Sequence, residues 1–286
     1  MPDPDVAAAV ARLDELTRRL RRECPWDREQ DERSIVPHTV EEAYELADAA
    51  NARDDAKLLD ELGDVLFQVH FLSLLLEERG VGDLAQVAEH CRRKLIRRHP
   101  HVFGEEAAEE AAAAEGLHAD PTTSREVLRN WDAIKRVEPG REAGIFGDVP
   151  ETLPALLHAR KVQRRAASSG FEFPGVEGPL AGAEAELAEL ADAVAAAGAD
   201  AERGAGAPGE VRDALFHEVG DVLFAAVNVA RKLAVDPELA LRSASARFRG
   251  RIETAERLAA EAGDDWAALP AEHQLTYYAK ARLTET

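Results

Sequence analysis

The sequence is poor in cysteine and in aromatic residues. Its 286 residues include only Cys24 and Cys91 as cysteines, and aromatic side chains make up 5% of the chain. Neither cysteine has a neighbour at metal-ligand spacing, and two cysteines in a chain of this size do not build a disulfide framework. The N-terminus also lacks an apolar signal segment. We therefore expect a protein of a reducing compartment, the cytoplasm.

Positive charge is in deficit as well. The chain has 35 Lys and Arg against 55 Asp and Glu, a formal net charge of −20. This balance disfavours nucleic acid and anionic membranes as main partners, because like charges repel. No apolar run approaches membrane-spanning length. We expect neither a nucleic-acid nor a membrane partner, while small anionic ligands held through a metal ion remain possible.

Strand patterns are missing, and helical patterns fill the chain. We find no convincing alternating stretch longer than four residues, and the length is typical of two domains. We expect an all-α fold of two tandem helical-bundle repeats. The expected parts are an N-terminal repeat over 1–137 with an Ala/Glu-rich linker at 104–121, an interdomain linker at 138–153, and a C-terminal repeat over 154–286.

Two acidic pairs dominate the first repeat. Glu42 with Glu45 and Glu61 with Asp64 lie on either side of a polar turn around Arg53. Each pair is spaced i, i+3, which places its members on one helix face. In an antiparallel hairpin that turns near Arg53, Glu45 is level with Glu61, roughly 12 Å from the turn at about 1.5 Å per residue. Glu42 is then level with Asp64, so four carboxylates converge if the two faces meet.

Convergence of carboxylates carries an electrostatic cost. Two of them about 4.5 Å apart repel by roughly 4 kcal/mol at an effective dielectric constant near 20. The group must protonate, move apart or bind cations, and oxygen-only ligands favour Mg²⁺, with Mn²⁺ as a substitute. The alternative is a solvated acidic helix face, which a capping box from Thr39 to Glu42 would support locally.

An internal repeat favours the metal site over the solvated face. DELGDVLF at 60–67 recurs as HEVGDVLF at 217–224. The second copy also keeps four acids at matched levels, although its hairpin tip is 13 residues longer. These acids are Glu186, Glu189, Glu218 and Asp221. A solvated acidic face does not require this register, so the matched levels favour a metal site. Ala183 replaces Thr39 in the second copy, so a capping box cannot explain the acids there.

The second helix of each hairpin is apolar as well as acidic. Its stripe in the first copy consists of Leu58, Leu62, Val65, Val69, Leu72 and Leu76. Further apolar residues surround the stripe, so we expect this helix to be buried on two sides. Gly63 and Gly220 stand beside the acids in both copies, for which close approach of a helix is the natural reason. The stripes offer more apolar surface than one hairpin can cover, which predicts a homodimer.

Several motifs together resemble the MazG family of nucleoside triphosphate pyrophosphohydrolases. They are EExxE at 41–45, ExxD at 61–64, CPWDREQ at 24–30, KLIRRHPHVFG at 94–104, WDAIK at 131–135 and GFEF at 170–173. The resemblance covers nearly the whole chain. It implies an all-α homodimer that uses Mg²⁺ to hydrolyse NTP or dNTP to a monophosphate and pyrophosphate, in nucleotide-pool housecleaning.

The resemblance also implies roles for residues outside the acidic sets. Lys94 and Arg98 match a basic pair that would stabilise the leaving pyrophosphate, and Trp131 with Lys135 matches an element that binds substrate. Glu41, four residues before Glu45, would orient or deprotonate the attacking water. The local alternatives are pairing with the helix end for the basic pair and core packing for Trp131. The counterparts in the second copy are Arg247, Arg251 and Lys280.

The second copy departs from the first at two of these positions. Ala185 stands in place of Glu41, and Thr276 in place of Trp131, so we expect the first repeat to contribute more catalysis. Asn228 either contacts nucleotide or pairs with another polar side chain, and His70 is expected to be a core histidine. Two alternatives to a pyrophosphohydrolase of broad substrate range stay open. One is a non-catalytic metal-binding interaction or regulatory protein, and the other is a related pyrophosphatase with one dedicated substrate.

Overall fold

The computed structural model describes residues 4–104, 107, 117–118, 120–138, 144–147 and 149–284. The chain divides into two compact units, Met1–Ala143 and Gly144–Thr286. Within the described ranges every regular element is helical, which confirms the all-α expectation. Most of the predicted linker 104–121, and residues 139–143 and 148 of the predicted linker 138–153, lie outside the described residues.

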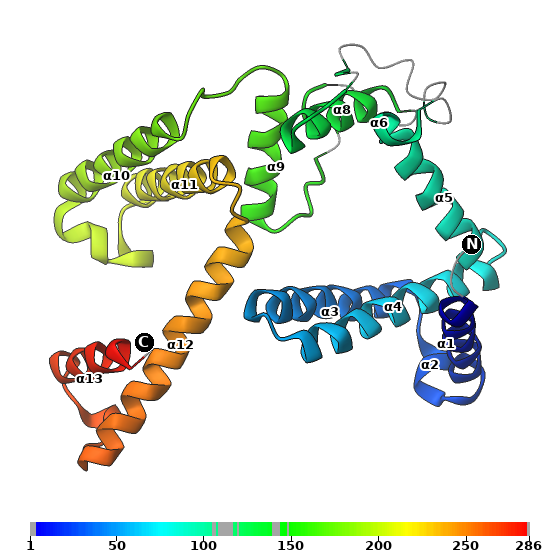
Figure 1. Cartoon of the computed structure of the whole chain (residues 1–286). Helices are drawn as coiled ribbons and strands as arrows, with labels where there is room; N and C mark the ends of the chain where they lie inside the picture. The colour runs from blue at the N-terminus through cyan, green and yellow to red at the C-terminus, as the bar shows by residue number, and fades with distance from the viewer. Residues whose placement is uncertain are drawn as a thin grey trace. The chain divides into compact units, whose positions relative to one another are not determined.

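Unit 1 is built on an antiparallel helical hairpin (Figure 1). Its elements are α1 (Pro4–Glu23), α2 (Pro25–Glu29), α3 (Glu32–Ala52), α4 (Asp55–Glu78), α5 (Leu84–Arg97), α6 (Pro100–Phe103) and α8 (Ser124–Val137). The α3–α4 hairpin encloses a core of Ile35, Phe71 and Leu75, against which Phe67 and Leu72 pack. CPWDREQ contains the short helix α2, because Pro25 is suited to a first helical position.

The first helix of the hairpin begins earlier than the sequence indicated. Asp31 caps α3 by accepting hydrogen bonds from the backbone N–H groups of Arg33 and Ser34 at 2.8 and 2.9 Å. The Ser34 hydroxyl in turn accepts the backbone N–H of Asp31 at 2.8 Å. The capping box from Thr39 to Glu42, which would have supported a solvated acidic face, therefore does not form. Thr39 lies inside the helix, where its hydroxyl donates to the Ile35 carbonyl at 3.3 Å.

The hairpin turns at Arg53, as the symmetry of the acids predicted. Arg53 adopts the left-handed conformation with φ of 56°, and its N–H closes the end of α3. Asp54 then caps α4 by accepting the backbone N–H of Lys57 at 3.1 Å. A two-residue connection between two capped ends fixes which residues of α3 and α4 are level.

Ion pairs fasten α1 to the far end of α4. Arg18 donates to both carboxylate oxygens of Glu77 at 2.9 and 2.6 Å, and Arg21 to both of Glu78 at 2.8 Å each. His70 is 1% exposed and lies 3.6 Å from Asp14, measured from Nδ1 to Oδ1. His70 is thus a core histidine, as expected from the apolar run around it.

Unit 2 repeats the hairpin and adds a second pair of helices (Figure 1). Its elements are α9 (Ala155–Ser168), α10 (Glu177–Ala197), the 3₁₀ turns η1 (Gly198–Glu202) and η2 (Gly204–Gly206), α11 (Gly209–Lys232), α12 (Pro237–Ala262), η3 (Trp266–Ala268) and α13 (Ala271–Leu283). Helix α10 packs against α11, and α13 folds back on α12. The longer hairpin tip of this copy contains the two 3₁₀ turns.

Two expectations about the acidic helices are wrong. A Cβ added at Gly63 or at Gly220 would meet no atom within 4 Å, so close approach of a neighbouring helix does not explain either glycine. The predicted stripe is also only partly covered, with Leu62 49% and Val69 39% exposed. The buried positions of α4 are instead Glu61, Gln68, His70, Phe71, Ser73, Leu74 and Leu75.

Thr123 caps α8 through a capping box with Glu126. No helix among the described residues is long and apolar enough to cross a membrane.

Candidate metal centre and its surroundings

The hairpin of unit 1 brings three of the predicted acids together. Carboxylate oxygens of Glu42, Glu45 and Glu61 all lie within 4.8 Å of one another. Glu61 is 5% exposed, whereas Glu45 is exposed to solvent. Asp64, the fourth predicted ligand, is exposed one turn further along α4. We call Glu42, Glu45, Glu61 and Asp64 the first acidic group.

Unit 2 forms a comparable cluster at the matched positions. Glu186, Glu218 and Asp221 offer carboxylate oxygens within 4.8 Å of one another. Glu189, the fourth predicted ligand, is exposed on the neighbouring turn of α10. We call Glu186, Glu189, Glu218 and Asp221 the second acidic group. Each copy therefore has an acidic group that could hold a metal ion, although a different three of the four positions converge.

Mutual repulsion is felt at both groups. Burial, followed by the charges of Asp64, Glu45, Glu61 and Glu41, raises the pKa of Glu42. Burial, followed by the charges of Glu189, Asp221 and Glu218, raises the pKa of Glu186 in the same direction. The fourth acids, Asp64 and Glu189, thus raise the pKa of Glu42 and of Glu186 through their charge. A cation that balances these charges would favour the ionised form of Glu42 and of Glu186.

A lysine and a histidine that sequence reasoning did not identify lie beside the first acidic group. Lys57 Nζ is 3.7 Å from Glu61 Oε1, one helical turn earlier on α4. His38 Nδ1 is 3.2 Å from Glu41 Oε2 on α3. The i, i+4 and i, i+3 spacings could have revealed both pairs from the sequence. The second copy has Ala214 and Gly182 at the corresponding positions.

The proposed basic pair does not contact the first acidic group. Arg98 donates to Glu138 Oε1 at 2.9 Å and to Oε2 at 2.7 Å, and Arg97 shares Oε1 at 2.8 Å. Burial alone would raise the pKa of Glu138, but the hydrogen bonds from Arg98 and Arg97 hold it at about 2. Lys94 is half-buried near the end of α5. The structure thus places Arg98 in an ion pair between the end of α5 and the end of α8.

Trp131 and Lys135 lie on α8, away from the acidic hairpin in sequence. The Trp131 ring meets the His99 ring edge-on, with centroids 4.8 Å apart. Its indole Nε1 is buried and has no hydrogen-bond partner among the residues that the structure describes. Lys135 is half-buried on the following turn. Trp131 therefore packs on the RRHPH segment.

The residues predicted to bind substrate in the second copy lie on separate helices. Arg247 and Arg251 lie on α12, where Arg247 Nη1 donates to the Ser243 hydroxyl at 2.6 Å. Lys280 lies on α13 with its Nζ 4.7 Å from the centroid of the Tyr277 ring. Asn228 accepts hydrogen bonds from Arg231 Nη2 at 2.7 Å and Nε at 3.1 Å. Of the two readings of Asn228, the structure shows the polar pair.

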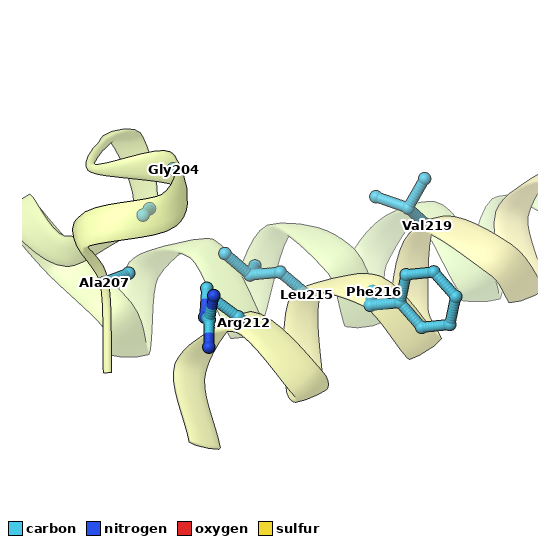
Figure 2. A pocket seen from close by; sticks show the side chains of 7 residues that line it. Gly204, Ala207, Arg212, Leu215, Phe216 and Val219 are labelled. Atoms are coloured by element: carbon cyan, nitrogen blue, oxygen red, sulfur yellow. The ribbon is translucent and has the colours of Figure 1, made fainter. Parts of the chain in front are cut away.

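An apolar concavity lies at the tip of the second hairpin (Figure 2). It has a volume of about 330 Å³. Figure 2 shows Arg212, Leu215, Phe216 and Val219 along α11, with Gly204 and Ala207 on the segment that precedes this helix. Gly204 begins a GxGxxG match, but it lies in a 3₁₀ turn and no carboxylate lines the concavity.

The geometry of the two acidic groups agrees with the family of proteins to which the chain is similar. The profile of the MazG nucleotide pyrophosphohydrolase domain matches residues 30–103, which include the whole α3–α4 hairpin. The nucleoside triphosphate pyrophosphohydrolase of Escherichia coli K12 is 35% identical over 259 residues, which cover 89% of this chain and 89% of the relative. The chain belongs to the MazG family. The nucleoside triphosphate pyrophosphohydrolase/pyrophosphatase MazG of Thermotoga maritima is 35% identical over 260 residues, 91% of this chain and 89% of the relative.

A third relative matches a smaller part of the chain. The nucleoside triphosphate pyrophosphohydrolase of Mycobacterium tuberculosis is 33% identical over 165 residues, 57% of this chain and 45% of the relative. The family assignment confirms the resemblance that the EExxE, ExxD and RRHPHVF motifs carry, and it places the chain among hydrolases of phosphoanhydride bonds.

Proposed function

We propose that the chain hydrolyses nucleoside triphosphates between the α and β phosphates, giving a nucleoside monophosphate and pyrophosphate with the help of Mg²⁺. The observation that supports this proposal is that three carboxylates converge in each of the chain's two hairpins. The chain also belongs to a family whose relatives are nucleoside triphosphate pyrophosphohydrolases. A triphosphate carries about four negative charges, so a protein of net charge −20 can receive it only through cations.

The donor set fits a hard divalent cation. Every ligand atom that the two clusters offer is a carboxylate oxygen. Hard cations such as Mg²⁺ and Mn²⁺ prefer this type of ligand, whereas softer metals prefer nitrogen or sulfur. The raised pKa of Glu42 and of Glu186 has the sign expected of groups that a cation would balance. When bound, Mg²⁺ neutralises the carboxylates and polarises a phosphoryl oxygen. The residues proposed to hold it are the four acids of the first acidic group and the four of the second.

Other side chains would act on the substrate and on the attacking water. Glu41 is the proposed water-orienting group or base of the first copy, since its charge already acts on Glu42. Lys94 and Arg98 are proposed to stabilise charge on the leaving pyrophosphate. Trp131 and Lys135 are proposed to bind the nucleotide, with the free indole N–H as the supporting observation. For the second copy we propose Arg247, Arg251 and Lys280 in binding roles, and Asn228 through its contact with Arg231.

The experiment that tests the reaction uses the purified full-length chain. It is incubated with each of the common NTPs and dNTPs in the presence of Mg²⁺, and the products are separated by anion-exchange chromatography. We expect equal amounts of monophosphate and pyrophosphate, and no activity with excess EDTA or in the double variant Glu61→Gln/Glu218→Gln. Orthophosphate and a diphosphate as the main products would overturn the proposal.

We also propose that the chain forms a homodimer. Exposed apolar residues line α4 and α11 at equivalent positions, among them Leu59 at 74%, Leu66 at 42%, Phe216 at 76% and Leu223 at 52%. A monomer rarely leaves such contiguous apolar faces in water. Multi-angle light scattering at micromolar concentration should therefore give twice the mass of the chain, and a monomeric mass would refute this part of the proposal.

A further inference from the structure

His38 of α3 contacts Glu41, the residue that precedes the first acidic group, and has no role in the proposed reaction so far. His38 Nδ1 is 3.2 Å from Glu41 Oε2, and Glu41 is the residue before Glu42. Because an ionised carboxylate only accepts hydrogen bonds, this contact requires the proton of the imidazole to be on Nδ1. The imidazole also meets the ring of Trp26 edge-on, with centroids 5.8 Å apart. His38 is thus held by α2 while it contacts Glu41 of α3.

The second repeat lacks both members of this pair. At the positions of His38 and Glu41 it has Gly182 and Ala185, although it keeps all four acids. An i, i+3 pair that only stabilised a helix would be useful in either copy, and α10 gives up helix propensity by having a glycine there. The simultaneous absence of both side chains indicates that they serve one task, and that the task is separate from gathering the acids.

We propose that His38 is a positioning residue for Glu41. The Nδ1–H of His38 restrains the Glu41 carboxylate, which would otherwise rotate freely, since its side chain is 67% exposed. The carboxylate then stays next to Glu42, where it orients the attacking water. This inference rests on the proposed function, because orientation of water matters only if the chain hydrolyses a phosphoanhydride bond.

The kinetic test compares two isosteric replacements. The amide nitrogen of asparagine occupies the place of Nδ1, whereas that of glutamine occupies the place of Nε2. We expect His38→Ala and His38→Gln to lower kcat by about tenfold or more, the usual effect of losing a residue that orients a site, with KM changed less than about threefold. His38→Asn should keep at least half of the wild-type kcat. His273→Ala, an exposed histidine of α13, is the matched control and should be unchanged.

Coupling between the two side chains provides the second test. In a Glu41→Gln background, His38→Ala should cause no further loss of kcat, because the group on which His38 acts has been removed. A full additional loss would show that His38 acts independently and would overturn the proposal. So would a wild-type kcat in His38→Ala, or an equal loss in His38→Asn and His38→Gln.

A readout without turnover separates failure of this inference from failure of the proposed function. In ¹H–¹⁵N spectra of the histidine rings, assigned with His38→Asn, wild-type His38 should carry its proton on Nδ1, and Glu41→Gln should weaken that preference. An Nε2-protonated ring in the wild type would overturn the inference even if the enzyme is active. If the ring carries its proton on Nδ1 but the chain has no pyrophosphatase activity, the hydrogen-bonded pair is confirmed and its catalytic role is refuted.

Discussion

The repulsion between the carboxylates of the first acidic group is clearest at Glu42. Its pKa is raised by burial and by four neighbouring carboxylates, so ionised Glu42 destabilises the fold when no cation is present. A carboxyl group with a raised pKa stabilises the fold only below its unfolded pKa, and this contribution is lost as pH rises through the folded value. The repulsion is therefore expressed as pH rises and Glu42 ionises.

The first prediction follows from this sign. In EDTA at pH 7, Glu42→Gln should raise the melting temperature, because it removes one of the repelling charges. With millimolar Mg²⁺ the same variant should melt below the wild type, because it has lost a ligand. Differential scanning fluorimetry in both buffers measures the reversal, with Glu202→Gln as a charge-matched control outside both acidic groups. A difference of the same sign in both buffers would contradict the metal site.

Glu172 is a carboxyl group with the opposite shift. Hydrogen bonds from Arg231 at 2.8 and 3.0 Å, together with Lys232, hold the pKa of Glu172 at about 2, against an ordinary value of 4.5. A lowered pKa contributes stability above the unfolded value, and the contribution is lost as pH falls from about 4.5 towards 2. The pair fixes the segment before α10 to the end of α11.

The second prediction concerns this pair. Glu172→Gln should lower the free energy of unfolding by about 1 kcal/mol at pH 7, a value reduced for solvent screening of a partly exposed pair. The gap to the wild type should narrow as pH is lowered from 5 to 3. Urea denaturation across this range measures it, and Glu202→Gln again serves as the control. A gap that stays constant with pH would show that Glu172 contributes through packing and not through its charge.

At the scale of single elements, the hairpin turn of unit 1 contains a strained residue. Arg53 has φ of 56°, a region that costs a residue with a side chain about 1 kcal/mol and costs glycine almost nothing. Ala234, which follows α11 in unit 2, has a similar φ of 57°. Both residues end a helix in the left-handed conformation that glycine usually provides.

The third prediction uses these two positions. Arg53→Gly and Ala234→Gly should each stabilise the folded chain by about 0.5 kcal/mol, because relief of strain exceeds the added entropy of the unfolded chain. Arg53→Val should destabilise it, because β-branched residues tolerate this region poorly. Urea-unfolding midpoints compare the three variants with the wild type. Loss of stability in both glycine variants would mean that the native side chains make contacts that outweigh the strain.

The start of α3 is an element boundary that local sequence patterns do not give. Pro37 by itself favours a helix that begins after it. The structure instead passes through Pro37 and begins α3 at Glu32. Ile35, which is 0% exposed, packs against Phe71 and Leu75, so burial of this residue and the Asp31 cap hold the additional turns. The burial of Ile35 cannot be predicted from a local sequence pattern, because its partner Phe71 lies on another helix.

At the scale of the whole molecule, the two repeats keep the same acids but differ around them. The first copy has Glu41, Lys57 and Trp131, and the second has Ala185, Ala214 and Thr276 at the corresponding positions. Both acidic groups have the ligands to bind metal, but only the first has a proposed water-orienting group beside it. We therefore expect the first repeat to contribute most of the turnover.

The fourth prediction tests this division with one pair of identical changes. Glu61→Gln should lower kcat by about 10² to 10³-fold, a typical effect of losing one group that stabilises the transition state. Glu218→Gln should lower kcat by less than about tenfold. The two variants are measured side by side with the best substrate of the NTP panel. If Glu218→Gln abolishes turnover while Glu61→Gln is near wild type, the assignment is reversed.

The sequence by itself determined the helical class, the hairpin turn at Arg53 and the positions of the eight acids. These properties depend on local patterns, namely helical periodicity, a polar turn and an internal repeat whose register fixes levels. The family followed from the same motifs, because they carry the chemistry in short stretches of chain. Three of the four acids expected in each copy converge, so the sequence located both acidic groups.

Only the tertiary structure decided which three acids converge in each copy and which face of α4 is buried. Those outcomes depend on the rotation of α4 against α3, which buries Glu61 and Gln68 and leaves Leu62 in solvent. The structure likewise decided the partners of the functional side chains, such as Arg98 with Glu138 and Trp26 with His38. Contacts between helices follow from the packing of the whole unit, and one helical period contains no information about the helix that faces it.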